Sequence, residues 1–264
     1  MRGFLFAAAW LATAPVLASE PRDLCPDRPG LGTPACTVER GDTVFEIGLA
    51  DWTRDSSPGL RSEQFLIGDA LLRFGLNDTL EAQVGWTAYG RVRERDTLSG
   101  ATTRASRFGD VSLALRQNLR NPDGGGFSLA LMPYVNLPSG RKPVGAEDWS
   151  AGLRLPMSIE LGAVSLGFTP QIEAAVDGDG DGRHLSYGSV AGLGFGVSDA
   201  VSGSFEVSLI RDRDRAGHVT EALAGLSFGW QHGEDAQWDA GVNAGLNDDS
   251  PDVQIYVGYA RRFR

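Results

Sequence analysis

The chain is poor in lysine, cysteine and histidine. Its 264 residues include a single lysine, Lys142, with two cysteines and three histidines. Lysine and arginine together number 24 against 34 acidic residues, so the formal net charge is -10. Neutralising nucleic-acid phosphates needs a clustered basic surface, so we expect no nucleic-acid partner.

Long hydrophobic runs are also lacking. A mean hydropathy of -0.16 excludes a protein of many membrane helices, because each helix needs about 20 consecutive apolar residues. Glycine is abundant, with 35 residues, but it follows no G-X-Y period, which excludes collagen. The composition therefore indicates an acidic, β-rich and turn-dense protein.

The first 18 residues have the pattern of a secretory signal peptide. Arg2 precedes a short apolar run over 4–14, and small residues lead up to Ala18. The run is too short for a membrane anchor. We predict cleavage after Ala18 and export from the cytoplasm. Export would place Cys25 and Cys36 in an oxidising compartment, so we expect a disulfide that staples an irregular segment over 19–42.

From residue 43 onward, apolar and polar residues alternate, which is the pattern of half-buried strands. Leu80, Ala82, Val84 and Trp86, for example, alternate with polar or small neighbours. Twelve such stretches of about 10–13 residues occur up to residue 264. They predict one all-β domain over 43–264, a single antiparallel transmembrane β-barrel with a polar lumen.

Apolar and polar residues also alternate along the strands of a soluble β-sandwich, but three observations favour a barrel in the outer membrane of a Gram-negative bacterium. The stretches match a tilted membrane crossing in length, and the chain closes with Phe263 in register with the last apolar face. The connections alternate between short periplasmic turns and longer extracellular loops. The short turns are 77–78, 121–125, 162, 198–199 and 232–235, and the long loops are 53–62, 90–106, 138–147, 178–184, 211–218 and 247–252. Pro133 and Pro170 argue against a barrel, since each removes a ladder hydrogen bond and requires a bulge or bend in its strand.

Several aromatic residues share the outward parity and lie toward strand ends, where a membrane barrel has aromatic girdles. The alternative is ordinary core filling. These residues are Trp86, Trp149, Trp230, Trp238 and Tyr259.

Turn-plus-strand motifs support a family assignment. They are GLNDTLE (75–81), PYVNLPSG (133–140), AGVNAGLN (240–247), PDVQIYVG (251–258) and the closing RRF (261–263), with PGLGTP (29–34) in the leader. With these motifs the chain resembles, from about residue 39 to 263, the outer-membrane transporter-like β-barrel family named "putative MetA-pathway of phenol degradation". The resemblance implies uptake of aromatic compounds.

The inward parity predicts a set of lumen-lining side chains. They are Glu46, Asp69, Arg73, Glu81, Arg116, Tyr134, Arg154, Glu160, Glu173, Glu206, Asp239, Asn243, Tyr256 and Arg262. Buried charges must pair or face water, so they either brace the wall or line a solute path. Twelve strands make a barrel between the filled eight-stranded and the open sixteen-stranded types, so we expect a narrow passage. The sequence indicates no long plug or constriction loop.

An acidic loop is the one candidate metal site. Asp177, Asp179 and Asp181 alternate with glycines over 177–182, as in the first half of a calcium loop. Position 12 would be Gly188, where that loop needs a bidentate glutamate. Weak Ca²⁺ binding and a solvated surface loop are both open. We expect no other cofactor. The basic stretch 91–95 is a candidate contact for anionic lipid headgroups. Outer-membrane lipid and lipopolysaccharide are the expected partners, with lipopolysaccharide phosphates near the acidic loop.

Catalysis has little support. Only His184, His218 and His232 could serve as a base, and neither a G-x-S-x-G nor an H-E-x-x-H motif occurs. We therefore expect no enzyme, although an outer-membrane hydrolase using His184 or His218 is an alternative. The main prediction is a channel or transporter for passive or facilitated passage of small, aromatic or hydrophobic solutes. The other alternative is a non-conducting structural or adhesive barrel.

Overall fold

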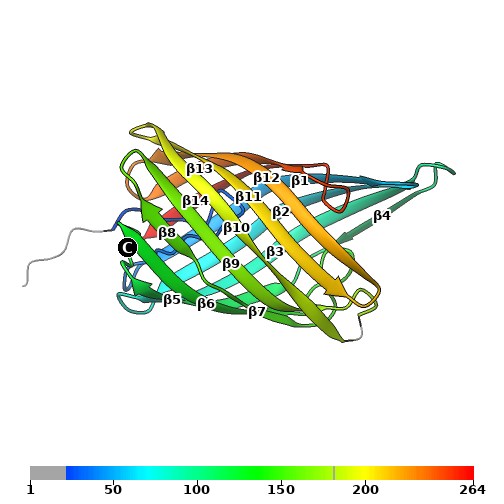
Figure 1. The fold of residues 1–264 in the computed structure, drawn as a ribbon, viewed down its shortest axis with the longest axis horizontal. Helices are drawn as coiled ribbons and strands as arrows, with labels where there is room; N and C mark the ends of the chain where they lie inside the picture. Colours follow the sequence, from blue (N-terminus) through cyan, green and yellow to red (C-terminus); the bar gives the residue numbers. More distant parts are fainter. Residues whose placement is uncertain (1–21, 181) are drawn as a thin grey trace, which may run out of the picture.

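The computed structural model describes residues 22–180 and 182–264, which form one closed antiparallel β-barrel (Figure 1). The predicted signal peptide lies outside these residues. No helix in the described part of the chain is long and apolar enough to span a bilayer.

Fourteen strand segments make up the barrel wall. They are β1 (Thr43–Ser57), β2 (Leu60–Gly75), β3 (Leu80–Asp96), β4 (Thr102–Arg107), β5 (Val111–Arg120), β6 (Phe127–Leu137), β7 (Ser150–Arg154), β8 (Met157–Glu160), β9 (Val164–Val176), β10 (Arg183–Ser198), β11 (Val201–Asp214), β12 (Gly217–His232), β13 (Ala236–Gly245) and β14 (Val253–Phe263). β4 and β5 are two parts of one strand, as are β7 and β8, so the ring contains the predicted twelve strands. It closes where β1 pairs with β14.

Burial is the reverse of that in a soluble protein. The four largest fully buried side chains are all charged: Glu46, Arg73, Glu81 and Arg116. Leu, Ile, Val and Phe side chains are exposed all around the outer face, for example Phe205, which is 48% exposed. Charge inside and hydrocarbon outside is the arrangement of a membrane barrel, whose outer face contacts lipid.

Three of the outward aromatic residues form a row at one end. Trp230 pairs with Trp238 across β12 and β13, and Trp238 pairs with Tyr259 across β13 and β14. The Trp238 and Tyr259 rings lie 4.8 Å apart. Both tryptophans are exposed, at 52% and 43%, as expected for a girdle at a membrane interface.

The two ends of the barrel differ. The end at which the C-terminus lies has turns of only two to six residues between strands (Figure 1). Arg22, the first described residue, also lies there and donates to Asp78 O in the β2–β3 turn. Short turns are typical of the periplasmic side, so we call this the periplasmic end and the opposite one the extracellular end.

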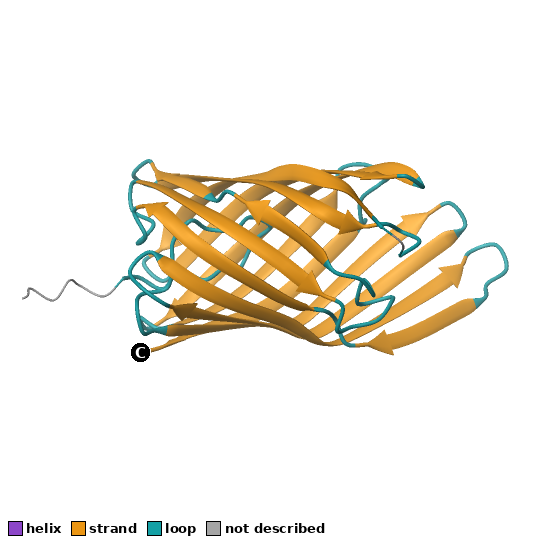
Figure 2. Cartoon of the chain, turned by 90° about the horizontal axis from the view of Figure 1, so that it is seen from below, coloured by secondary structure: helices purple, strands orange, loops and turns teal. Residues whose placement is uncertain are grey.

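The predicted extracellular loops are in part wrong. Most of 53–62, 90–106 and 211–218 is paired strand, and the β1–β2 and β3–β4 hairpins continue past the rim (Figure 2). Their polar side chains still pair across strands, as Arg93 Nη1 does with Glu63 Oε2 at 3.2 Å. Ladder hydrogen bonds therefore continue into water, and β3 reaches 17 residues instead of the expected 10–13.

The prolines are accommodated in two ways. The β5–β6 ladder lacks bridges between Ala114–Tyr134 and Gln117–Leu131, which is where Pro133 has no N–H to donate. Pro170 remains paired, and its carbonyl accepts from Leu155 N at 3.0 Å. The larger interruption is at Pro156, which separates β7 from β8 and was not predicted.

Candidate functional site: a plugged lumen

Residues 22–42 contain no strand and lie inside the barrel. We call this segment the plug. Its backbone and side chains bind inward-facing side chains on β1, β2, β3, β5, β9, β11 and β13. The plug thus crosses the lumen toward its periplasmic end, and the sequence-based expectation that the barrel has no long plug is wrong.

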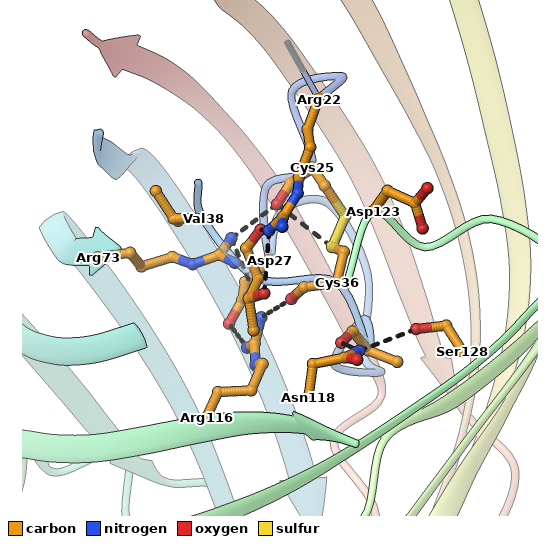
Figure 3. The surroundings of a disulfide bond; sticks show 12 residues. Arg22, Cys25, Asp27, Cys36, Val38, Arg73, Arg116, Asn118, Asp123 and Ser128 are labelled. Carbon is orange, nitrogen blue, oxygen red and sulfur yellow. Dashed lines mark hydrogen bonds and ion pairs between the residues drawn. A yellow bond between two sulfur atoms is a disulfide. The ribbon is translucent and has the colours of Figure 1, made fainter. Parts of the chain in front are cut away.

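A compact ion-pair cluster binds one side of the plug (Figure 3). The carboxylate of Asp27 accepts from two wall arginines, with Oδ1 3.1 Å from Arg73 Nη1 and Oδ2 2.6 Å from Arg116 Nη2. Glu46 and Glu81 pair with Arg73 from β1 and β3, at 3.1 and 3.0 Å. Two cations thus meet three carboxylates, and all of these side chains are fully buried except Asp27, which is 17% exposed. The arrangement satisfies the requirement that buried charges be paired.

The same cluster binds the plug backbone. Glu46 accepts from Asp27 N and Arg28 N, both at 2.9 Å, and Glu81 accepts from Val38 N at 2.6 Å. Burial alone would raise the pKa of the Asp27 carboxyl, but Arg116 and Arg73 hold that pKa below its usual value. Asp27 therefore stays ionised on the plug.

Cys25 and Cys36 form the expected disulfide. The two arginines bind the carbonyls of these cysteines, Arg73 to Cys25 O at 2.7 Å and Arg116 to Cys36 O at 3.1 Å (Figure 3). The bridge therefore sets the spacing of two carbonyls that the wall recognises. Nearby, Asn118 donates to Ala35 O at 2.8 Å.

The opposite side of the plug is bound by two acidic residues of the wall. Arg28 pairs through Nη2 and Nε with both oxygens of Asp239 on β13, at 3.0 and 3.3 Å. Glu206 on β11 accepts from Leu31 N at 2.7 Å and Gly32 N at 3.0 Å. A side chain on Gly30, whose φ is +124°, would collide with the Glu206 carboxylate.

Wall glycines make room for the plug. A Cβ on Gly258 of β14 would clash with the Arg28 guanidinium, and one on Gly75 of β2 would clash with the backbone of Glu39. Part of the high glycine content is thus explained by close approach of the plug to the wall.

The plug leaves a gap beside β9–β13. A cavity of about 500 Å³ there is lined by small polar wall residues that include Ser165, Gly194, Ser202, Ser204 and Ser227. A second cavity of about 210 Å³ shares several lining residues with it and extends past Thr169 and Glu206. The plug contributes Pro26, Pro29 and Pro34 to both cavities. The gap therefore has an apolar proline side and a hydroxyl-rich side.

The other predicted lumen residues divide into several groups. Tyr134 donates to Glu173 at 2.9 Å, and Arg154 lies over the Tyr134 ring and donates to Gln171. Asn243 donates to Gln254, Tyr256 lies under Arg28, and Asp69 accepts from Thr87. Arg262 is near the periplasmic end, paired with Asp235 and bound to the plug at Arg22 O. Glu160 ends β8 at the periplasmic rim, where it is exposed, accepts from Gly126 N and lines the larger cavity.

The acidic loop meets one of the three histidines. Asp177 contacts His184 and groups with Asp214, while Asp181 lies outside the described residues. In the part of the chain that is described, the ring nitrogens of His184 contact carboxylates, and no serine or cysteine nucleophile is among those contacts. His218 belongs to β12 at the extracellular end, and His232 ends the same strand at the periplasmic end.

The plug was missed because its sequence has no periodicity. The available signal was the inward acids Glu206 and Asp239, whose parity leaves them without a cation on neighbouring strands. Such residues require a partner from elsewhere in the chain. A Pro- and Gly-rich segment that is closed by a disulfide lies directly before the first strand. It can supply backbone N–H donors to Glu206 and the Arg28 side chain to Asp239.

Comparisons with known proteins agree with this architecture. The COG4313 outer membrane channel from Pseudomonas putida F1 is similar at a TM-score of 0.69 and 15% identity, covering 87% of this chain and 98% of that one. The translocator domain of the autotransporter NalP from Neisseria meningitidis has a TM-score of 0.51 at 16% identity, covering 84% and 88%. The NanC porin has a TM-score of 0.50 at 8% identity, covering 83% and 98%. At these identities the likeness shows the fold.

No curated protein matches the sequence. The family described as "Putative MetA-pathway of phenol degradation" matches residues 26–263, which include nearly all of the plug and the whole barrel. The chain therefore belongs to that family of outer-membrane β-barrels, as its motifs predicted.

Proposed function

We propose that the protein is an outer-membrane channel for passive or facilitated passage of small aromatic solutes, and that these pass through the gap between the plug and β9–β13. The observation that carries the proposal is the gap itself. A plug that served only to seal the lumen would be expected to fill it, whereas this one leaves contiguous cavities along one side.

The lining of the gap favours a ring that bears a polar group. Proline rings of the plug offer an apolar surface on one side, and the hydroxyls of Ser165, Ser204 and Ser227 lie on the other. A phenol or hydroxybenzoate has both surfaces, an apolar ring and a hydroxyl that must remain hydrogen-bonded when it leaves water. The family description also supports a phenolic solute, and the similarity to a channel supports passage.

Single-channel conductance of the refolded mature protein tests this proposal. Benzoate, 4-hydroxybenzoate and cyclohexanecarboxylate have similar size and equal charge but differ in ring character and hydroxyl. We expect discrete conductance that 4-hydroxybenzoate blocks most strongly and cyclohexanecarboxylate least. Conductance that the three solutes block equally would reject the aromatic preference, and a folded barrel that never conducts would reject the channel.

A sealed structural barrel is the second candidate, because the cluster around Arg73 and Arg116 is closed to water on one side of the plug. If the barrel is sealed, substitutions in the plug would change the stability of the protein, and neither the wild type nor the variants would conduct. We also propose that arginines of the extracellular hairpins contact lipopolysaccharide. Arg91, Arg93 and Arg95 lie on β3 beyond the length needed to cross the membrane.

A further inference from the structure

Three elements at the extracellular end bring a histidine and three carboxylates together. Asp177 directly follows β9, His184 is the second residue of β10, and Asp212 and Asp214 end β11. Asp177 and His184 each expose only 7% of the side chain. None of this group contacts the plug or takes part in the proposed passage.

The Nδ1 side of the imidazole faces two of the carboxylates. His184 Nδ1 lies 2.9 Å from Asp177 Oδ1 and 3.7 Å from Asp214 Oδ2. Zinc binds histidine nitrogen and carboxylate oxygen at about 2.0–2.2 Å, so tetrahedral ligands lie about 3.3–3.5 Å apart. The two distances lie on either side of this range, and small side-chain rotations would bring all three atoms onto one ion.

The charge of the group is unbalanced. Within residues 22–180 and 182–264, every ion pair of Asp177, Asp212 and Asp214 is made to His184. The nearby cations have other partners, since Arg183 pairs with Asp148 at 2.8 Å and Lys142 Nζ donates to Gly178 O. Even a protonated imidazole leaves two negative charges on the group, in which Asp212 is 34% exposed and the other side chains are 16% exposed or less. A divalent cation would compensate these charges.

The surrounding backbone holds the carboxylates in place. Gly178 N and Ala216 N donate to the two oxygens of Asp214, at 2.6 and 2.7 Å. A Cβ on Gly182 would lie 2.7 Å from Asp177 Oδ2, so glycine there keeps space for the carboxylate. His184 Nε2, the nitrogen away from the site, lies 2.5 Å from Asp212 Oδ1. A carboxylate behind the distal nitrogen is the usual second shell of a metal-bound histidine.

We propose that Asp177, His184 and Asp214 form a zinc site at the extracellular mouth, with Asp212 orienting the imidazole. An imidazole nitrogen among the ligands favours zinc or a similar transition ion over Ca²⁺, which takes oxygen ligands. Three protein ligands leave one position for water or a donor atom of a solute. The group borders a cavity of about 510 Å³ that also reaches Val219 and Glu221, so there is room for that fourth ligand.

Calorimetric titration of untagged, chelator-treated protein, refolded in detergent, with ZnCl₂ and then CaCl₂ tests the site. The wild type should bind one Zn²⁺ per chain, and excess Ca²⁺ should not displace it. H184Q and D214N should lose stoichiometric binding, and D212N should weaken it by about 10–100-fold. The matched controls H218Q, on the neighbouring hairpin, and D179N, in the acidic loop, should bind zinc as the wild type does.

The outcomes separate the two metal hypotheses. Ca²⁺ binding that D179N removes and H184Q leaves intact would overturn the zinc site in favour of the calcium loop. Absence of zinc binding, or binding that survives H184Q, would also overturn it. Heat-modifiable migration on gels reports whether each variant folds. If H184Q fails to fold, X-ray absorption of the zinc-loaded wild type decides, since a ligand shell without imidazole contradicts the proposal.

Discussion

The carboxylate of Asp27, carried by the plug, lies 2.6 Å from the guanidinium of Arg116 on β5. The two residues are 89 positions apart in sequence, and the same carboxylate also reaches Arg73 on β2. One plug side chain thus joins two strands of the wall. Release of the whole plug from the wall must separate this carboxylate from both arginines.

D27N should loosen the plug. The variant keeps the shape of the side chain but removes the charge, and breaking a buried ion pair by removing one partner costs about 3–5 kcal/mol. We expect the low end, because Glu46 and Glu81 still neutralise the arginines. Hydrogen exchange over residues 22–42 should accelerate in D27N, and conductance should rise. Asp23 is exposed on the same segment, so D23N is the matched control and should match the wild type. Equal exchange in D27N and D23N would contradict the anchoring role.

The pH dependence of plug binding follows from Asp27. Its pKa is held below the ordinary value of 3.8, so its contribution to plug docking is fully present above that value and is lost as the pH falls through the lowered pKa. Raising the pH from 5 to 8 should therefore leave this anchor unchanged. The protection of plug amides, after correction for the intrinsic pH dependence of hydrogen exchange, should fall only below about pH 4, and D27N should lack that acid-dependent step. If the wild-type plug is released between pH 5 and 8 and D27N abolishes that release, the pKa of Asp27 is raised instead of lowered and this prediction is wrong.

The gap can be narrowed without touching the plug. Gly196 on β10 lines the larger cavity, and a Cβ there would meet nothing within 4 Å. G196L should therefore lower solute flux while hydrogen exchange of the plug stays unchanged. A191L adds similar bulk to the outer face of the same strand, next to Val207, and should have no effect on flux. Unchanged flux in G196L would show that solutes take another route.

The disulfide should limit how far the plug can move. It closes a loop between residues 11 positions apart, which removes about 3 kcal/mol of conformational freedom from the undocked segment. The double variant C25S/C36S should show faster hydrogen exchange over residues 22–42 and noisier conductance. Dithiothreitol should produce the same change in the wild type and none in the variant. A wild type that does not respond to complete reduction would show that the wall contacts alone hold the plug.

Strand pattern and strand number could be predicted because lipid enforces them. Each outward position contacts hydrocarbon, so Phe205 and Val207 must alternate with residues such as Ser204 and Glu206, and this period of two is readable in one sequence. Strand ends were less predictable. In the extracellular hairpins neither face contacts lipid, so Glu63 and Arg93 can continue a ladder in a stretch whose composition suggests a loop. The break at Pro156 also depends on tertiary context, because Pro133 and Pro170 interrupt no strand.

The candidate site was only half predictable. Inward parity located Glu46, Arg73, Glu81 and Arg116, but it did not show what they bind, because parity describes a wall and says nothing of what fills the interior. Asp27 and Arg28, two charged side chains of the plug that bind the wall, lie outside any periodic pattern. The grouping of His184 with Asp177 and Asp214 depends on the register between β10 and β11, which one sequence does not reveal.

The contacts of Arg28 bear on how the barrel assembles. This residue precedes every strand in the chain, yet it is enclosed by Asp239 on β13 and Gly258 on β14, the last two strands to be synthesised. The ring closes between β1 and β14, so a plug that docks early offers the arriving terminal strands a prepared surface. Closure of the barrel and enclosure of the plug are then a single step. We therefore expect a substitution of Arg28 to appear first as a defect in barrel assembly.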